Sequence, residues 1–481
     1  MQNIYPDNFE TKIGFDRIRE MLHNKCISTM GNEWVDEMHF QTSFEAIDRQ
    51  LGELEEFCLI IREFDNFPAN HFYDLREALQ KIRLEGRFLE PAELFDLKRS
   101  LESVRAIVNF FNKQEEEIFP ILKQKISNVQ VFPYIYDRID TIVNKFGKIR
   151  DNASPELAQI RKSVLSMQSS MSKRLHSILK QAQKDGLVDE DASISIRDGR
   201  AVIPISAGNK RKLKGIVYDE SATGKTSYVE PNEIVEMNNE IRELEYAERR
   251  EVVKILTAFS DDIRPYLDEL SYSYEFLGEI DFIRSKALLA VEFEAIKPDF
   301  HKEPIIEWYR AIHPLLQKAL KREKRKIVPL DIKLTDEKHI LLISGPNAGG
   351  KSVCLKTTGL LQYMLQCGLL IPVNEGSKTG VFSQLFIDIG DEQSLENDLS
   401  TYSSHLLNMK HFVRNCNNKT LVLIDEFGTG TEPLLGGSIA ESILDKLNEL
   451  KTFGVITTHY TNLKHFASSA EGIVNGAMLY D

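Results

Sequence analysis

The sequence predicts a multidomain protein that combines an all-helical part with an α/β part built on a largely parallel sheet. Three observations predict this fold: helical spacing of apolar residues over about residues 8–130, two long apolar repeats in the middle of the chain, and alternating strand-like and helix-like segments beyond about residue 300. A length of 481 residues is enough for about three domains. We place the domain limits at 1–130, at 131–190 together with 231–300, at 191–230, and at 301–481.

Composition and charge narrow the class of protein. With 42% hydrophobic and 28% charged residues, the chain is typical of a globular protein and is neither disordered nor fibrous. Its 60 basic and 73 acidic residues give a net charge of −13, so nucleic acid would have to meet a local basic patch. The amino terminus has charges where a signal peptide has its apolar core, and no run of eighteen apolar residues occurs, so we expect a cytoplasmic protein without a membrane partner. The five cysteines lack CxxC spacing, which favours neither a disulfide framework nor a zinc site.

Two long helices are expected in the middle of the chain. Ser154 and Pro155 have the residue types of a helix cap and first turn. The apolar residues that follow are spaced three and four apart in a pattern that repeats every seven residues, with one break at Arg174, and a second such run has Glu248 as its one polar member. Each helix would be about 45 Å long, so the two could pair antiparallel as a coiled coil; two ordinary core helices are the alternative. The first run is Leu157, Ile160, Val164, Met167, Met171 and Ile178, and the second is Ile234, Met237, Ile241, Leu244, Val252, Ile255 and Phe259.

A small β unit is expected between these helices. Residues 193–205 alternate between apolar and polar, turn at Asp198-Gly199, and alternate again, which predicts a β-hairpin. A second strand pair is expected at 215–218 and 226–229. The cations that lie between the two hairpins, and that we predict to bind nucleic acid, are Lys210, Arg211, Lys212 and Lys214.

The strongest chemical signal is a glycine-rich loop that follows one expected strand and precedes a helix. Residues 345–352 fit the G-x-x-x-x-G-K-S pattern, whose glycines let backbone N–H groups converge on phosphates at the positive end of a helix. Lys351 would add charge beside the β and γ phosphates, and Ser352 would ligate Mg²⁺. A similar pattern at 223–226 is rejected because Asp219 stands where its upstream glycine is needed. The predicted ATP-binding residues here are Gly345, Pro346, Asn347, Ala348, Gly349, Gly350, Lys351, Ser352 and Val353.

Two adjacent carboxylates end a later strand. Residues 421–424 lead into Asp425 and Glu426, which places both side chains at the carboxyl edge of the sheet, where α/β proteins bind ligands. We expect Asp425 to hold Mg²⁺ directly or through water, and Glu426 to polarise the attacking water. His459 ends the strand at 455–458 and would sense the γ-phosphate.

At these residues the sequence resembles the MutS family, whose ATPase belongs to the ABC superclass, and most closely the second bacterial MutS type, a paralogue that often carries an Smr nuclease tail. The resemblance covers nearly all 481 residues. It implies a helical core, two lever helices with a small β clamp at their tip, and an ABC-type P-loop ATPase that dimerises. The resemblance is carried by LEPAEL (89–94), IRDGRAVIPI (196–205), AIHPLL (311–316), VPLDI (328–332), GPNAGGKS (345–352), GDEQSLENDLSTYSSH (390–405), LVLIDEFGTGTEP (421–433) and ITTHY (456–460).

The same resemblance implies further roles. Ser400 and Thr401 would reach the γ-phosphate of the partner's nucleotide, in a composite site across a homodimer. Gln393 would lie near the attacking water, as a further catalytic residue beside Glu426, Lys351 and His459. The stretch around His313 and Val328 would lie near the adenine.

Several departures from the family pattern are visible. The family commonly has Arg-His-Pro where this chain has Ile312-His313-Pro314, and Asp where it has Glu432. We expect no counterpart in these 481 residues of the mismatch-reading amino-terminal domains of repair-type MutS, with their Phe-x-Glu wedge. The one Phe88-Leu89-Glu90 stands before a helix-starting proline, and we interpret it as structural. Because the sequence stops before the remaining ATPase strands, the dimerising helices and any Smr tail, we expect a truncated product.

Two functions are weighed. The leading hypothesis is an ATP-hydrolysing DNA clamp that acts on branched or recombination-intermediate DNA to suppress recombination. The alternative is a ribosome-associated quality-control ATPase that binds stalled ribosomes or their RNA. A chromosome-tethering protein of the SMC kind is disfavoured, because there the coiled coil separates the two phosphate motifs, whereas here both motifs fall within about 110 residues, the span of one α/β domain.

Overall fold

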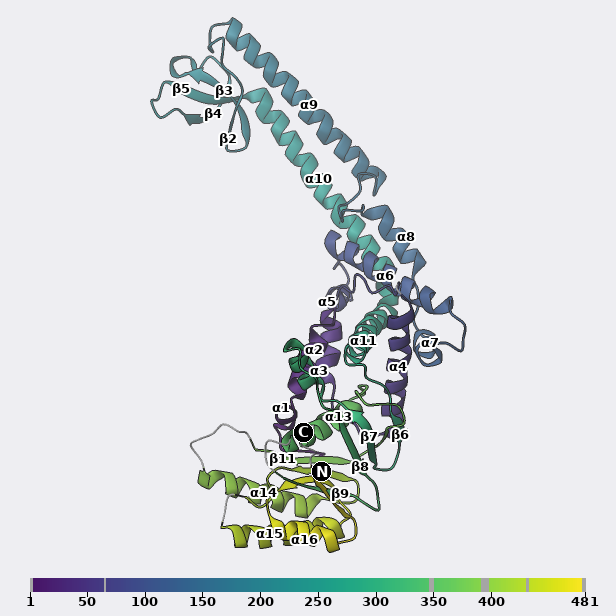
Figure 1. Ribbon diagram of the computed structural model, residues 1–481. Helices are drawn as coiled ribbons and strands as arrows, with labels where there is room; N and C mark the ends of the chain where they lie inside the picture. Colours follow the sequence, from purple (N-terminus) through teal and green to yellow (C-terminus); the bar gives the residue numbers. More distant parts are fainter. Residues whose placement is uncertain (1–2, 65, 346–349, 391–397, 430–431, 478–481) are drawn as a thin grey trace. The chain divides into compact units, whose positions relative to one another are not determined.

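Figure 1 shows the computed structural model, which describes residues 3–64, 66–345, 350–390, 398–429 and 432–477. The chain divides into two units. The first comprises Met1–Asp74, Ser103–Val129 and Tyr272–Asp481, and the second comprises Leu75–Glu102 and Gln130–Ser271. The domain limits predicted from the sequence divide the chain differently and stay a prediction.

The first unit contains a six-stranded sheet in which every neighbouring pair of strands is parallel. The strand order is β1-β11-β12-β13-β9-β14. All residues of β11, β12 and β13 are buried, which is the pattern of strands covered on both faces. The predicted mixture of helix and sheet with a largely parallel sheet is therefore confirmed. The strands are β1 (Ile4–Tyr5), β9 (Ile340–Ser344), β11 (Gln384–Asp388), β12 (Thr420–Ile424), β13 (Phe453–Thr458) and β14 (Ile473–Ala477).

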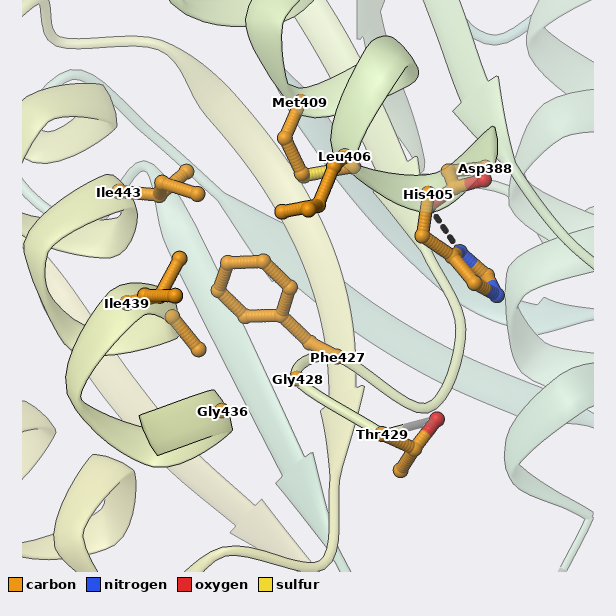
Figure 2. Close-up of a pocket in the computed structure, with 11 residues that line it drawn as sticks. Asp388, His405, Leu406, Met409, Phe427, Gly428, Thr429, Gly436, Ile439 and Ile443 are labelled. Carbon is orange, nitrogen blue, oxygen red and sulfur yellow. Dashed lines mark hydrogen bonds and ion pairs between the residues drawn. The ribbon is translucent and has the colours of Figure 1, made fainter. Parts of the chain in front are cut away.

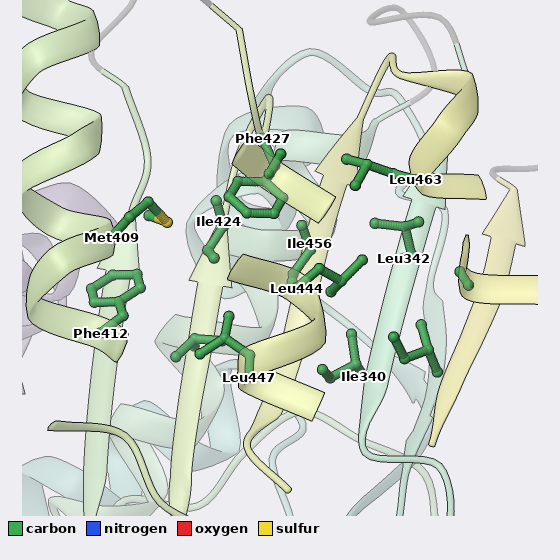
Figure 3. Packing of buried hydrophobic residues seen from close by; sticks show 14 of the residues in the cluster. Ile340, Leu342, Met409, Phe412, Ile424, Phe427, Leu444, Leu447, Ile456 and Leu463 are labelled. Atoms are coloured by element: carbon green, nitrogen blue, oxygen red, sulfur yellow. The ribbon is translucent and has the colours of Figure 1, made fainter. Parts of the chain in front are cut away.

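Helices cover both faces of this sheet. Alternation along β12 turns Val422 and Ile424 to the face covered by α14 (Asp398–Asn415), α15 (Pro433–Glu449) and α16 (Thr461–Ser469). Leu423 points to the opposite face, where it contacts Gly359 of α13 (Lys351–Gln366). Figure 3 shows the first of these cores, in which strand residues such as Ile340 and Ile456 meet helix residues such as Phe412, Leu444 and Leu463.

Helix α13 is buried on nearly all sides because helices of the same unit cover its outer face. It packs against α1 (Phe9–Ile13) and α4 (Phe44–Glu63), and Gly359 touches Ile13. The helix that follows the glycine-rich loop is thus held between the sheet and a helical layer. The same unit also contains α2 (Phe15–His23), α3 (Thr29–Glu37), α7 (Pro120–Ile126), α12 (Pro314–Arg322) and a second sheet of β6 (Asp299–His301), β7 (Ile306–Ala311), β8 (Leu330–Leu334) and β10 (Lys378–Gly380). Helices α6 (Pro91–Asn112) and α11 (Leu267–Glu292) have residues in both units.

The second unit is dominated by two long antiparallel helices, α9 (Pro155–Lys184) and α10 (Asn232–Ile263). The Ser154 hydroxyl caps α9 by accepting a hydrogen bond from the Leu157 N–H, as its residue type predicts. The two polar breaks in the apolar repeats are explained by pairing: Arg174 binds Glu233, and Glu248 accepts a hydrogen bond from Arg161. Shorter helices of this unit are α5 (Arg76–Lys81), α8 (Pro133–Ile142) and the 3₁₀ turn Arg264–Tyr266.

A four-stranded antiparallel sheet joins the two long helices. Its order is β2-β3-β5-β4, and Asp198 and Gly199 turn the β2–β3 hairpin with positive φ angles of 47° and 75°. An apolar cluster that includes Leu175 and Leu179 of α9 and Ile203 of β3 packs the sheet onto the helices. The strands are β2 (Ser195–Arg197), β3 (Arg200–Ser206), β4 (Gly215–Glu220) and β5 (Thr226–Pro231), with a short 3₁₀ turn at Ala207–Asn209.

In the described part of the chain, no helix is both long enough and apolar enough to cross a membrane.

Candidate nucleotide site

The predicted site residues follow parallel strands whose last residues pair with one another in the sheet. In the parallel sheet, Ser344 of β9 pairs with Thr458 of β13, and Ile424 of β12 pairs with Asp388 of β11. Because carboxyl ends of parallel strands share one edge, the loops after these strands meet there. The predicted residues that this register brings to that edge are Gly345, Asp425, Glu426 and His459.

Lys351 is the first residue of α13 and lies almost completely buried, with 2% of its surface exposed. The preceding Gly350 has a φ angle of 80°, a left-handed conformation that glycine adopts without strain. The Lys351 ammonium donates a hydrogen bond to the Gly345 carbonyl, and its Nζ lies 3.3 Å from Nε2 of His459.

Burial lowers the pKa of Lys351, and the nearby carboxylates of Asp425 and Glu426 oppose that shift. Within the described residues, no carboxylate lies within ion-pair distance of the Lys351 ammonium. A buried cation whose described partners are a carbonyl and an imidazole can gain a strong charge-assisted hydrogen bond from a phosphate oxygen. The surroundings of Lys351 therefore fit a phosphate group.

Thr457, which sequence reasoning missed, holds the acidic pair in place. Its hydroxyl donates a hydrogen bond to Oδ1 of Asp425 at 2.5 Å and accepts one from the Glu426 N–H at 2.8 Å. Glu426 has a φ angle of 48°, a conformation that costs a non-glycine residue free energy and that concentrates at functional sites. No feature of the strand sequence at 453–458 marks Thr457 as a contact of Asp425, because the pairing register sets that contact.

A second group missed from the sequence lies at the end of β11. Asp388 is 4% exposed, accepts a hydrogen bond from Nδ1 of His405 at 2.6 Å, and accepts another from the Asn408 amide at 2.7 Å. The hydrogen bond to Asp388 raises the pKa of His405. The Asp388 carbonyl also accepts a hydrogen bond from the Asp425 N–H. The one sequence signal for this group is a lone acid ending an otherwise apolar run.

Figure 2 shows the pocket beside this pair. It is small, about 30 Å³ in volume, and apolar side chains from α14, α15 and the loop after β12 form most of its wall. The His405–Asp388 hydrogen bond lies at one side of it. The apolar wall consists of Leu406, Met409, Phe427, Ile439, Ala440 and Ile443.

His313 and Val353, both predicted to contact nucleotide, line one open pocket of about 390 Å³. His313 caps α12 by accepting a hydrogen bond from the Leu316 N–H, and burial lowers its pKa to about 4, so the imidazole is neutral at pH 7. Lys12 and Lys356 also line the pocket. Val328, predicted near the adenine, is 89% exposed. The base-binding role of this region stays a prediction.

Several predicted residues fall outside what the structure describes. Pro346, Asn347, Ala348, Gly349 and Gln393 lie outside the described residues. Ser400 and Thr401 lie near the beginning of α14, and their side chains are outside the description as well.

The residues predicted to hold Mg²⁺ offer the oxygen donors that this ion prefers. In the described residues, Oδ2 of Asp425 and the Ser352 hydroxyl accept no hydrogen bond, while Oδ1 of Asp425 is fixed by Thr457. No group of three or more His, Cys, Asp or Glu side chains able to hold a metal occurs among the described residues. Mg²⁺ usually takes only one or two protein oxygens and completes its shell with water and substrate phosphates. The two oxygen ligands that Ser352 and Asp425 could provide fit this coordination preference of Mg²⁺.

The predicted nucleic-acid loop lies between β3 and β4 of the second unit, and its four cations are exposed. Lys210 forms an ion pair with Glu220 at 3.0 Å, which offsets its charge. The other three form no ion pair within the described residues. These three are Arg211, Lys212 and Lys214.

Comparison with known proteins identifies the family. Residues 341–480 match the family model of MutS domain V. The chain is 36% identical over 468 residues to Endonuclease MutS2 of Alkaliphilus oremlandii, which covers 97% of this chain and 58% of that protein. It is 37% identical over 470 residues to Endonuclease MutS2 of Pelotomaculum thermopropionicum, which covers 98% of this chain and 59% of that protein.

The chain thus spans less than two thirds of the length of these relatives. The segment matched by the domain model contains the strand, loop and helix around Lys351 as well as Asp425, Glu426 and His459. The resemblance seen in the sequence is confirmed, and the chain is a member of the MutS family that is similar along nearly all of its length to the MutS2 proteins.

Proposed function

We propose that this chain binds and hydrolyses ATP at the carboxyl edge of the parallel sheet and couples hydrolysis to DNA binding. The observation that carries the proposal is the convergence of a buried lysine with two carboxylates and a histidine: Lys351, Asp425, Glu426 and His459. Membership of the MutS family supports the same activity. Endonuclease activity is part of the relatives' name, and the proposal for this chain does not include it.

The proposed roles follow from the geometry. Lys351 binds the β and γ phosphate oxygens, since its ammonium is buried and already desolvated. Glu426 accepts a hydrogen bond from the attacking water, and Thr457 fixes the backbone from which Glu426 projects. Ser352 and Asp425 would hold Mg²⁺, which neutralises charge on the phosphates when it is bound. His459, within reach of Lys351, contacts the γ-phosphate.

Paired substitutions test the assignment. In Glu426→Gln the carboxylate that orients water is lost while the phosphate contacts remain, so ATP should bind and hydrolysis should stall. In Lys351→Ala both ATP binding and hydrolysis should weaken. Glu471→Gln, an exposed residue, serves as the matched control and should hydrolyse ATP at the wild-type rate. Wild-type turnover in Glu426→Gln would contradict the role given to that residue.

For the DNA substrate we propose branched or recombination-intermediate DNA, bound by α9 and α10 acting as levers and by the β2–β5 sheet acting as a clamp. The antiparallel pairing of the helices and the apolar packing of the sheet against them support this arrangement. Such an activity would suppress recombination. A four-way junction labelled for fluorescence anisotropy, bound to Glu426→Gln with ATP and Mg²⁺ and challenged with homoduplex and then with ribosomes, tests it. Displacement by ribosomes at low concentration would instead favour the ribosomal alternative.

We also propose a homodimer, in which Ser400 and Thr401 of one chain complete the nucleotide site of the other. The position of both residues near the beginning of α14, the helix that contributes His405 beside Asp388, supports the proposal. Specific ATPase activity should then rise with protein concentration. A specific activity that stays constant while sedimentation reports a monomer would contradict it.

A further inference from the structure

The two long helices of the second unit carry opposite charge. Helix α9 has six lysine and arginine residues and a single acid, whereas α10 has four lysine and arginine residues and nine acids. Part of this difference serves their mutual pairing, since Arg161 and Arg174 of α9 bind Glu248 and Glu233 of α10. The four lysines of α9 are not among these pairs with α10. They are Lys162, Lys173, Lys180 and Lys184, and together they are called the lysine face.

The lysine face lies on the side of α9 that points away from α10. Lys173, Lys180 and Lys184 are seven and four residues apart, and Lys162 precedes Lys173 by eleven, so all four fall on one stripe of the helix. All four are exposed, whereas the residues that contact α10 and the sheet, such as Leu157 and Leu175, are buried.

No negative charge neutralises this stripe. Within the described residues, none of the four lysines forms an ion pair, although the chain as a whole carries a net charge of −13. Between the lysines the stripe presents small polar side chains, and a shallow groove there is lined by Ser172, His176 and Ser177 together with Lys173, Lys180 and Lys184. The face ends at Lys184, because Asp185 follows directly and accepts a hydrogen bond from Gln181.

We propose that the lysine face binds the phosphate backbone of double-stranded DNA. The proposal rests on the proposed DNA-binding function and adds a contact surface separate from the Lys210–Lys214 loop. Most residues between these lysines are small and polar, and Leu165 is the one large apolar side chain exposed on α9, so a phosphate backbone can approach the helix closely. From Lys162 to Lys184 the face extends about 33 Å, close to one turn of B-DNA, so a duplex lying along α9 meets lysines at both ends of a turn.

The test neutralises the face without changing helix propensity. In the variant Lys162→Gln/Lys173→Gln/Lys180→Gln/Lys184→Gln, each glutamine keeps a good helix former at its site. The control variant makes the same change in net charge at exposed lysines on other elements: Lys113→Gln/Lys145→Gln/Lys148→Gln/Lys338→Gln. Binding of the 481-residue chain to a labelled homoduplex and to a duplex RNA of the same sequence is measured by anisotropy across a salt series.

We expect DNA affinity of the lysine-face variant to fall at least about tenfold, and the slope of log affinity against log salt to fall by about 0.9 for each lost contact. The control variant should bind DNA like wild type, and circular dichroism should report unchanged helix content in both variants. Equal DNA binding by the lysine-face variant and wild type would overturn this surface while leaving the proposed function intact. Failure of wild type to bind DNA, or tighter binding of the RNA duplex through the same lysines, would overturn both.

Discussion

Thr457 of β13 donates a hydrogen bond to Asp425 at the end of β12, and the same hydroxyl accepts one from the Glu426 N–H. One side chain thus fixes two neighbouring acids that are proposed to have different roles. In Thr457→Val the hydroxyl is lost with almost no change in shape. A hydrogen bond to a charged group contributes about 1.5–3 kcal/mol, so ATP hydrolysis should fall about tenfold or more.

Two further measurements separate positioning from general loss of structure. ATP binding by Thr457→Val, measured by calorimetry, should stay within about threefold of wild type, because Lys351 is unaltered. Thr457→Ser keeps the hydroxyl and should restore most of the hydrolysis rate. If the serine variant were as slow as the valine variant, the hydroxyl would have no part in positioning Asp425.

The Asp388–His405 pair predicts a pH-dependent contribution to stability. Because the hydrogen bond to Asp388 raises the pKa of His405 above its unfolded value, the pair stabilises the fold fully below that unfolded value, about 6.5. The contribution is lost as the pH rises through the higher folded pKa. Wild type should therefore exceed His405→Gln in unfolding free energy by more at pH 6 than at pH 9, measured by urea titration. A difference that is the same at both pH values would contradict a charged pair.

The contacts of Thr457 and of Asp388 show what the sequence can and cannot predict. Gly345 to Ser352 and the Asp425-Glu426 pair were visible because local patterns, a strand followed by a glycine-rich turn or by two acids, place them at a sheet edge. Thr457 and Asp388 were not, because their partners depend on which strands are neighbours and on their register. That information is set by packing of the whole sheet.

The same division holds in the second unit. The Asp198-Gly199 turn was predicted because those residue types tolerate positive φ, and the structure has them at 47° and 75°. Arg174 and Glu248 were recognised only as breaks in an apolar repeat. Their ion-pair partners became identifiable once the antiparallel register of α9 and α10 was known.

Removal of the Asp281 carboxylate is expected to destabilise the first unit strongly. This fully buried carboxylate accepts hydrogen bonds from the N–H groups of Ile27 and Ser28 and from the Ser28 hydroxyl, which itself caps α3. Asp281→Ala would leave the buried N–H and hydroxyl of Ser28 without this acceptor, so we expect a loss of about 3 kcal/mol. Asp268→Ala is the control, because its side chain is 85% exposed and pairs with Arg83 near the surface, and it should lose less than about 1 kcal/mol.

Urea titration followed by tryptophan fluorescence suits this test, because Trp34 lies in α3 itself. Its ring stacks on Phe282, the residue next to Asp281, at 6.2 Å between centroids. A midpoint for Asp281→Ala that matched the Asp268→Ala midpoint would show that the cap contributes little.

Arg200 is expected to be a structural cation of the β2–β5 sheet. It forms an ion pair at 2.8 Å with Glu230, whose side chain is 0% exposed, and its guanidinium lies over the Tyr218 ring. In Arg200→Met the Glu230 carboxylate would stay buried with its charge uncompensated, although Asn238 still donates to it. Removing one partner of a buried pair costs about 3–5 kcal/mol, so the sheet should open locally. Hydrogen exchange of β3 and β5 amides should accelerate by about a hundredfold or more.

The control variant is Arg197→Met. It removes an exposed cation from the neighbouring strand, where Arg197 stacks over Tyr228, and it should change the same exchange rates by less than about fivefold. Equal protection in the two variants would mean that Glu230 tolerates burial without Arg200.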